Sequence, residues 1–141
     1  MRGILVVRAD GTPLGLHVAD VEHVLDLGDV HPAPGRLPAV RGVTAVGGRL
    51  LPLVHLRSLL AQSAPPAARG RTGVIVRCGG ARVVLEVDDA EAVLPETPKP
   101  VPEGWRIAWA SGFLEGERVI PIVDVDVLAE RLSSVVRSEA R

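Results

Sequence analysis

Residues 40–60 read VRGVTAVGGRLLPLVHLRSLL, and this stretch decides the fold. Apolar segments flank Gly47-Gly48, and two successive glycines suit a two-residue hairpin turn because both turn positions must accept a positive φ. We expect Pro52 to break the second strand, and the apolar residues that follow predict a short helix. The stretch therefore predicts a strand, a hairpin turn, a second strand and a helix.

Most of this stretch occurs twice in the chain. Residues 112–128 read GFLEGERVIPIVDVDVL, and residues 49–56 align with residues 118–125 at an offset of 118 − 49 = 69 positions. Residues 14–25 align with residues 83–94 at the same offset, because 83 − 14 = 69. Self-similarity at a fixed offset indicates that the chain consists of two similar halves.

The first part of each half repeats the same order of elements. Asp10-Gly11 in the first half and Gly79-Gly80 in the second half are strong two-residue turn signals between short apolar segments. Residues 19–25 are expected to form a short turn of helix or a bent strand. Each half is therefore predicted to contain a hairpin, a bent connection, a loop, a second hairpin and a helix.

Proline and polar residues mark the loops and the end of the chain. Residues 30–38 and 95–102 are rich in proline and are expected to be surface loops without regular structure, while residues 62–72 are expected to be a linker. Asp124 is a suitable N-cap, and apolar residues follow it at helical spacing. The chain is thus predicted to end in a helix.

The predicted fold class is mainly β, with two five-stranded β-barrel lobes that share a core, short helices and a C-terminal helix. Short strands separated by regular turn signals are typical of small barrels. Half of this chain would bury too little surface to be stable alone, so the halves are expected to share their core. Residues 1–141 are predicted to form one domain, with lobe-forming repeats at about 3–61 and 73–137.

The composition argues against several classes of function. Of the 141 residues, 47% are hydrophobic, but one Phe, two Trp and no Tyr leave an aliphatic core. A net charge of −1, a pI near 6.4 and few stacking aromatics argue against nucleic-acid binding. The apolar run 4–7 is too short for a signal peptide or membrane span, and Cys78 is the only cysteine. We therefore expect a cytoplasmic protein with no membrane insertion and no disulfide within the chain.

No set of catalytic or metal-binding residues stands out in the sequence. Four histidines match no close ligand spacing, and no second cysteine completes a zinc set: His17, His23, His31 and His55. Asp124 and Asp126 stand at an expected helix start, where capping explains them, and Ser111 lacks the G-x-S-x-G context of a nucleophile. We therefore expect a protein that is not an enzyme, with no catalytic residue, no metal site and no cofactor.

Two fused barrels without reactive groups favour a binding module. Small barrels offer sheet edges and a cleft between lobes as docking surfaces for other proteins. A small-ligand or enzymatic barrel that uses His17, His23 or His55 stays open as the weaker alternative.

Five segments of the repeat carry a resemblance to a known family. They are GLHVADVEHV (15–24), VRGVTAVGG (40–48), LPLVHLR (51–57), VDDAEAVL (87–94) and VIPIVDV (119–125). Over residues 3–132 the chain resembles the CheW-like family, the bacterial chemotaxis coupling proteins. The resemblance implies two SH3-like barrel lobes around a common core. It also implies a non-enzymatic adaptor that links the cytoplasmic tips of chemoreceptors to the regulatory domain of a histidine kinase, with other CheW-like proteins as further partners.

The resemblance also places the partner-facing residues. Val21 and Val24 match the stretch that faces the receptor, and residues 44–48 match the hairpin of the family motif G-V-x-N-L-R-G. The candidate partner-binding residues are Val21, His23, Val24, Thr44, Gly47 and Arg49.

Several residues depart from the family pattern. The Asn of the motif is Ala45, its Arg is Gly47, and the usual acidic residue opposite that Arg matches His23. The usual Asp before Leu-Arg is His55, whereas Asp124 keeps this Asp in the second half. Two interpretations follow. The chain is either a free-standing adaptor recruited to receptor arrays, or a divergent member that binds only one partner and modulates or insulates a pathway.

Overall fold

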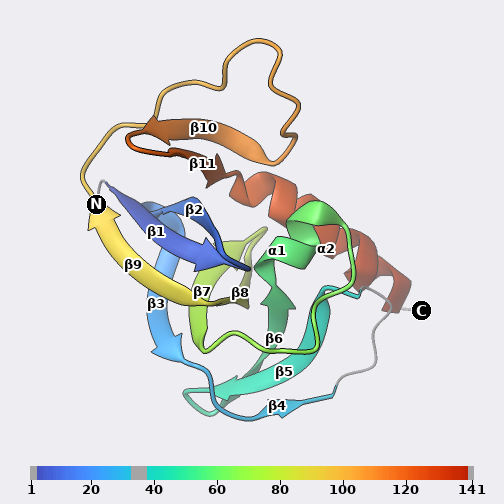
Figure 1. The fold of residues 1–141 in the computed structure, drawn as a ribbon. Coiled ribbons are helices and arrows are strands. Elements are labelled where there is room, and N and C mark those ends of the chain that lie inside the picture. Colours follow the sequence, from blue (N-terminus) through green and yellow to red (C-terminus); the bar gives the residue numbers. More distant parts are fainter. Residues whose placement is uncertain (1–2, 33–37, 140–141) are drawn as a thin grey trace.

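The computed structural model describes residues 3–32 and 38–139, which form two sheets and three helical segments (Figure 1). Sheet A has the strand order β10-β11-β2-β1-β9, and sheet B has the order β3-β7-β8-β6-β5-β4. The strands of sheet A are β1 (Ile4–Ala9), β2 (Thr12–His17), β9 (Asp89–Leu94), β10 (Ala110–Glu115) and β11 (Val119–Val123). The strands of sheet B are β3 (Val21–Asp26), β4 (Val30–His31), β5 (Val40–Val46), β6 (Arg49–His55), β7 (Thr72–Cys78) and β8 (Ala81–Val87). The helical segments are η1 (Val18–Asp20), α1 (Leu56–Ala61) and α2 (Val125–Glu139).

Each sheet takes strands from both halves of the chain. Sheet A joins β1 and β2 of the first half to β9, β10 and β11 of the second, while sheet B joins β3 to β6 with β7 and β8. The exchange is reciprocal, because the order β10-β11-β2-β1-β9 becomes β5-β6-β8-β7-β3 when each strand is replaced by its counterpart in the other half. The two sheets therefore do not coincide with the repeats 3–61 and 73–137.

Parallel pairing between the halves holds this exchange in place. In sheet B, Leu53 of β6 lies opposite Val84 of β8, and in sheet A, Ile122 of β11 lies opposite Gly15 of β2. These pairs are equivalent under the duplication, because 122 − 53 = 69 and 84 − 15 = 69. In each sheet, a strand of one half pairs directly with a strand of the other half. Neither sheet can therefore form from one half alone.

The core confirms that the two halves are packed together. The largest buried cluster lies between the sheets and includes Val7, Leu14, Val54, Leu85 and Leu128, which come from both sheets and from α2. Two smaller clusters belong to one sheet each. They consist of Leu51, Leu53, Ile75 and Val84 in sheet B, and of Ile4, Leu114 and Ile122 in sheet A. The predicted fold class, mainly β with two SH3-like lobes around a shared core, is confirmed.

The hairpin turns agree with the sequence prediction. Gly47 (φ 56°) and Gly48 (φ 80°) connect β5 to β6 with two positive-φ residues, as a type I′ turn requires. Asp10-Gly11 and Gly79-Gly80 connect β1 to β2 and β7 to β8 in the same way. These turns set the register of three hairpins.

Two expectations about proline are wrong. Pro52 does not break its strand, because β6 runs without interruption from Arg49 to His55. Hydrogen-bonded and non-hydrogen-bonded pairs alternate along β5 and β6 from the turn, and the pair of Pro52 with Val43 is a non-hydrogen-bonded one. On the other side of β6, the parallel pairing with β8 begins one residue later, at Leu53. The missing N–H therefore costs the sheet no hydrogen bond.

The first Pro-rich segment is also not free of regular structure. Val30 and His31 form the short strand β4 against β5, because both residues precede the first proline of the segment. Residues 33–37 of the predicted loop lie outside the described residues. The second Pro-rich segment makes one isolated bridge, between Lys99 and Phe113.

The predicted C-terminal helix and its cap are confirmed. The helix α2 begins at Val125, and Oδ1 of Asp124 accepts a hydrogen bond from the backbone N–H of Asp126 at 2.9 Å. In the part of the chain that the structure describes, neither α2 nor any other helix is long and apolar enough to cross a membrane.

Candidate partner-binding surface

Three of the predicted partner-binding residues lie on β3, an edge strand of sheet B. His23 and Val24 are exposed, whereas Val21 is half-buried and packs against the shared core. The register shifts between Val21 and His23, so Glu22 lies in a bulge opposite β7. We call the exposed residues His23 and Val24 the edge surface.

Two arginines fix Glu22 beside the edge surface. Its carboxylate accepts hydrogen bonds from Nε of Arg77 at 2.8 Å and from Nε of Arg82 at 2.6 Å. The hydrogen bonds from Arg77 and Arg82 lower the pKa of Glu22. The carboxylate is solvent-exposed, so these pairs fix the position of the side chain more than they stabilise the fold.

The other three predicted residues lie on the β5–β6 hairpin. Gly47 forms the turn and Arg49 is exposed beside it, but Thr44 is buried and its hydroxyl donates a hydrogen bond to the backbone oxygen of Asp29 at 3.0 Å. The side chain of Thr44 therefore holds the hairpin to the chain segment before β4 and does not face solvent.

The sequence prediction missed Leu50 on the same hairpin. This side chain is 64% exposed, the most of any large hydrophobic residue in the described chain, and lies opposite the exposed Ala45. Side chains alternate between the two faces of a strand, so the neighbour of the buried Leu51 is expected to face solvent. The sequence does not show this alternation, because Leu50 and Leu51 are both apolar. We call Ala45, Gly47, Arg49 and Leu50 the hairpin surface.

The structure does not bring the six predicted residues into one cluster. The edge surface lies on β3 and the hairpin surface on β5 and β6, and the sheet order places β7 and β8 between them. The family's pairing between positions 23 and 47 is absent, since Gly47 has no side chain to meet His23. The edge surface and the hairpin surface are therefore separate candidate surfaces.

The exposed aliphatic residues follow the internal repeat. Four large hydrophobic side chains are exposed among the described residues: Val24, Leu50, Val93 and Val119. They form two equivalent pairs, because 93 − 24 = 69 and 119 − 50 = 69. Val93 lies on β9, an edge strand of sheet A, and Val119 lies on the β10–β11 hairpin. Each lobe thus presents one exposed aliphatic residue on its edge and one on its hairpin.

The two hairpins differ in charge. Ala45 faces Leu50 on the first hairpin, whereas Glu115 faces Val119 on the second. Lys99 forms an ion pair with Glu115, and the hydrogen bond from Lys99 lowers the pKa of this carboxyl group. The first hairpin is therefore the more apolar of the two.

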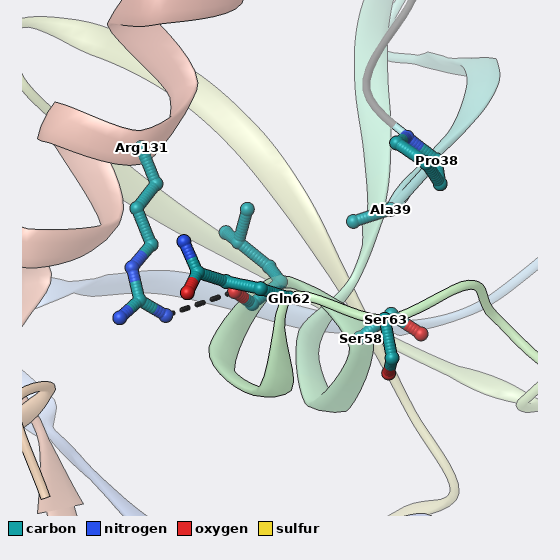
Figure 2. Close-up of a pocket in the computed structure, with 7 residues that line it drawn as sticks. Pro38, Ala39, Ser58, Gln62, Ser63 and Arg131 are labelled. Atoms are coloured by element: carbon teal, nitrogen blue, oxygen red, sulfur yellow. Dashed lines mark hydrogen bonds between the residues drawn. The ribbon is translucent and has the colours of Figure 1, made fainter.

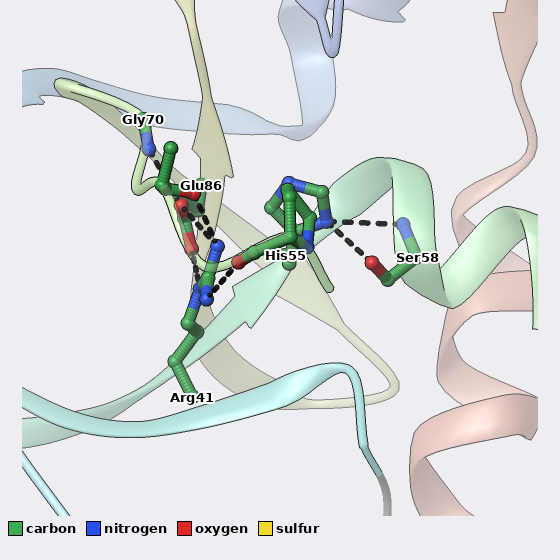
Figure 3. Close-up of polar contacts among 7 residues, drawn as sticks. Arg41, His55, Ser58, Gly70 and Glu86 are labelled. Carbon is green, nitrogen blue, oxygen red and sulfur yellow. Dashed lines mark hydrogen bonds and ion pairs between the residues drawn. The ribbon is translucent and has the colours of Figure 1, made fainter. Parts of the chain in front are cut away.

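A buried polar cluster lies at the end of the β5–β6 hairpin that is far from the turn, where β5 and β6 approach β8 (Figure 3). The carboxylate of Glu86 accepts two hydrogen bonds from Arg41, from Nε at 2.7 Å and from Nη2 at 3.2 Å. It also accepts the backbone N–H of Gly70 at 2.6 Å. Arg41 donates further to the carbonyl oxygens of Pro66 at 2.7 Å and Ala68 at 2.9 Å. This cluster ties the linker between the halves to sheet B.

His55 belongs to the same region and is the N-cap of α1. Its Nδ1 accepts a hydrogen bond from the backbone N–H of Ser58 at 3.2 Å and lies 2.6 Å from the Ser58 hydroxyl (Figure 3). Burial lowers the pKa of His55, which favours the neutral ring. The position is equivalent to Asp124, the cap of α2, because 124 − 55 = 69.

The histidines do not assemble into a ligand-binding site. His17, His23 and His55 lie on β2, β3 and β6, and His17 lines a shallow surface pocket of about 470 Å³ beside residues 95–98. No group of three or more His, Cys, Asp or Glu residues suited to a metal ion occurs among residues 3–32 and 38–139.

Cys78 is a core residue. Burial raises the pKa of its thiol to about 11, and Sγ lies 3.6 Å from the backbone oxygen of Val125. A thiol with this pKa is protonated at neutral pH and is a poor nucleophile.

A small pocket lies between α1 and α2 (Figure 2). Its volume is about 170 Å³, and its lining includes Ser58, Gln62 and Arg131. Nη1 of Arg131 donates to the carbonyl oxygens of Leu59 at 2.9 Å and Leu60 at 2.8 Å. The last carbonyl groups of a helix have no partner within the helix, and these hydrogen bonds supply one for two of them at the end of α1. Arg131 therefore has a structural role.

Comparisons with known proteins agree with the geometry. A family model described as a CheW-like domain matches residues 3–133. The crystal structure of the scaffolding protein TtCheW from Thermoanaerobacter tengcongensis has a similar fold, with a TM-score of 0.74 and 21% sequence identity over 86% of this chain and 88% of that chain. No curated protein sequence matches the chain.

Proposed function

Because the chain belongs to the CheW-like domain family, we propose that it is a chemosensory adaptor that links chemoreceptors to a histidine kinase. The family match over residues 3–133 carries this proposal. The exposed side chains of Val24 and Leu50 support it, because both lie in segments that carry the family resemblance and both are open to a partner. Membership of this family of scaffold domains confirms the prediction that the chain is not an enzyme.

Two surfaces are assigned to two kinds of partner. The edge surface around Val24 would contact the cytoplasmic tip of a chemoreceptor, and the hairpin surface around Leu50 would contact the regulatory domain of the kinase. The assignment rests on the exposure of both side chains and on the family motifs that contain them. Both partners belong to signalling assemblies at the inner face of the membrane, so this function places the protein in the cytoplasm, with recruitment to receptor arrays.

A second candidate is a divergent adaptor that binds only one of these partners. The hairpin surface favours it, because Ala45 and Gly47 replace the polar residues of the motif and leave Leu50 exposed beside a turn without side chains. A hairpin of this kind suits an apolar partner better than one that needs a charged contact. Such a chain would modulate or insulate a pathway.

Isothermal titration calorimetry with a receptor-tip fragment and with the kinase regulatory domain tests both candidates. We expect Val24→Asp to abolish receptor binding and leave kinase binding intact, and Leu50→Asp to do the reverse. Val93→Asp is the matched control, because it changes the equivalent exposed residue of the other lobe. Binding of neither partner by the unchanged chain would refute the adaptor function.

The second candidate predicts binding of one partner only. The combined change Gly47→Arg with His23→Glu should then restore affinity for the other partner, because it returns the charged residues of the motif to both surfaces. Unchanged affinity after this double substitution would contradict the divergent-adaptor interpretation.

A further inference from the structure

We propose that His55 is a pH-sensitive switch at the start of α1, which opens the N-cap of this helix when the imidazole ring takes up a second proton. The buried ring supplies the acceptor for the first turn of α1: Nδ1 faces the N–H of Ser58 at 3.2 Å and its hydroxyl at 2.6 Å. In a neutral ring that accepts at Nδ1, the single proton must be on Nε2. A protonated ring has an N–H on both nitrogens and can no longer accept either hydrogen bond.

The loss would be repaired only in part, because the Ser58 hydroxyl can turn to accept the new N–H at Nδ1 but the backbone N–H of Ser58 would keep no acceptor. Ser58 is buried, so its N–H cannot exchange the lost partner for bulk water without movement of the chain. The backbone N–H of His55 is fixed by the carbonyl oxygen of Ala39 at 2.8 Å, which holds the residue against β5. Relief therefore requires the first turn of α1 to open.

Charged groups on several elements surround the ring. Glu86 lies opposite His55 on β8, Arg41 reaches in from β5, and Asp10 and Asp88 lie farther away. The carboxylates favour the charged ring and Arg41 opposes it, but burial outweighs them and lowers the pKa. Glu86 is already committed to Arg41 and to the N–H of Gly70, so it cannot reorient toward a charged His55.

The lowered pKa of His55 makes the folded chain less stable in acid. The unfolded chain binds the proton near the ordinary pKa of 6.5, and the folded chain binds it only at lower pH. The contribution of His55 to stability is therefore complete above about pH 6.5 and is lost as the pH falls through the lower pKa of the folded state. The switch operates under mildly acidic conditions.

The second half provides an internal reference for the switch. Asp124 occupies the equivalent position before α2 and holds the N–H of Asp126 at 2.9 Å with a carboxylate. This cap uses an oxygen acceptor and contains no imidazole ring. Two equivalent helices in one chain thus begin with chemically different caps.

Opening of α1 would reach the C-terminal helix. The side chains of Leu56, Leu59 and Leu60 anchor α1 in the shared core, and Arg131 of α2 holds the carbonyl oxygens at the other end of α1. Because α1 has only six residues, loss of its first turn removes much of the helix. Acid would therefore weaken the contact between α1 and α2 while the sheets stay paired.

Amide hydrogen exchange measured by NMR on the full chain tests the switch. We expect protection of the Ser58 amide, corrected for intrinsic exchange, to fall roughly tenfold between about pH 7.5 and pH 5, while protection of the Asp126 amide stays constant. His55→Asn should make Ser58 protection independent of pH, because Asn caps helices without titrating in this range. His23→Asn is the matched control, and this exposed histidine should leave the wild-type response unchanged.

Two results would overturn the proposal. One is a Ser58 amide whose protection does not change with pH, or changes equally in His55→Asn. The other comes from the NMR chemical shifts of the His55 ring nitrogens in the unmodified chain. This measurement requires no variant to fold. A proton on Nδ1 at neutral pH, or a titration of His55 above the ordinary pKa of 6.5, would contradict the cap geometry.

Discussion

Removal of Arg41 should destabilise the protein strongly, because it would leave Glu86 without its charged partner. The Glu86 side chain is 0% exposed and the Arg41 side chain 12% exposed, and the two form a bidentate pair. After Arg41→Ala, the carboxylate would keep only the N–H of Gly70, and breaking a buried pair in this way costs about 3–5 kcal/mol. For a chain of this size the loss corresponds to a decrease in Tm of roughly 10–20 °C.

The same substitution should release the linker between the halves. Arg41 donates to the carbonyl oxygens of Pro66 and Ala68, so its removal frees two of the hydrogen bonds that hold this segment to sheet B. Limited proteolysis should therefore cut Arg41→Ala faster within residues 62–71 than it cuts the unchanged chain.

Thermal and urea denaturation of a small set of variants measure the effect. Arg49→Ala, which removes an exposed arginine from the neighbouring strand, is the control and should change stability by less than about 0.5 kcal/mol. The double substitution Arg41→Met with Glu86→Leu should recover much of the loss, since it leaves no charge buried. A loss below about 1 kcal/mol for Arg41→Ala would show that water replaces the lost partner of the Glu86 carboxylate, and would refute the reasoning.

Three further experiments test the packing. Gly15→Ala should cost about 1–3 kcal/mol, because a Cβ would lie 2.4 Å from Cδ1 of Ile122, while Gly28→Ala, with no atom within 4 Å, should be neutral by urea denaturation. Val123→Asp should lower the free energy of unfolding by on the order of several kcal/mol, because it places an unpaired charge at a fully buried position. An unchanged Tm would contradict the assignment of Val123 to the core. Cys78 should react with a thiol reagent at neutral pH at under roughly a tenth of the rate seen in denaturant, because its pKa is about 11; equal rates would show an accessible thiolate.

Local chemistry was sufficient to predict most elements from the sequence. Asp10-Gly11, Gly47-Gly48 and Gly79-Gly80 each require positive φ at two successive residues, and this backbone demand predicts hairpins without any tertiary information. The exchange of strands between halves could not be predicted in this way. The offset of 69 residues shows only that the two halves are similar. It is equally compatible with pairing of β2 and β11 across the halves and with pairing of each strand inside its own half.

The candidate site was predicted only in part, for reasons visible in single residues. Val24 was predicted and is exposed, but Thr44 points inward because its hydroxyl reaches the carbonyl oxygen of Asp29. The Arg41–Glu86 pair was missed, although a glutamate within the apolar strand of residues 83–87 is a signal that a partner must be buried with it. The partner itself is 86 − 41 = 45 positions away, and only the fold brings it near.

The duplication also separates what the backbone imposes from what the side chains add. Equivalent strands must have equivalent exposure, so geometry alone makes positions 24 and 93, and positions 50 and 119, face solvent together. Geometry does not require these positions to be aliphatic, and exposed strand residues are more often polar. Glu86 and His55 are buried, whereas their counterparts in the other half, His17 and Asp124, are half-buried. Aliphatic residues at all four exposed positions are therefore a property of the side chains in both lobes and do not follow from the backbone alone.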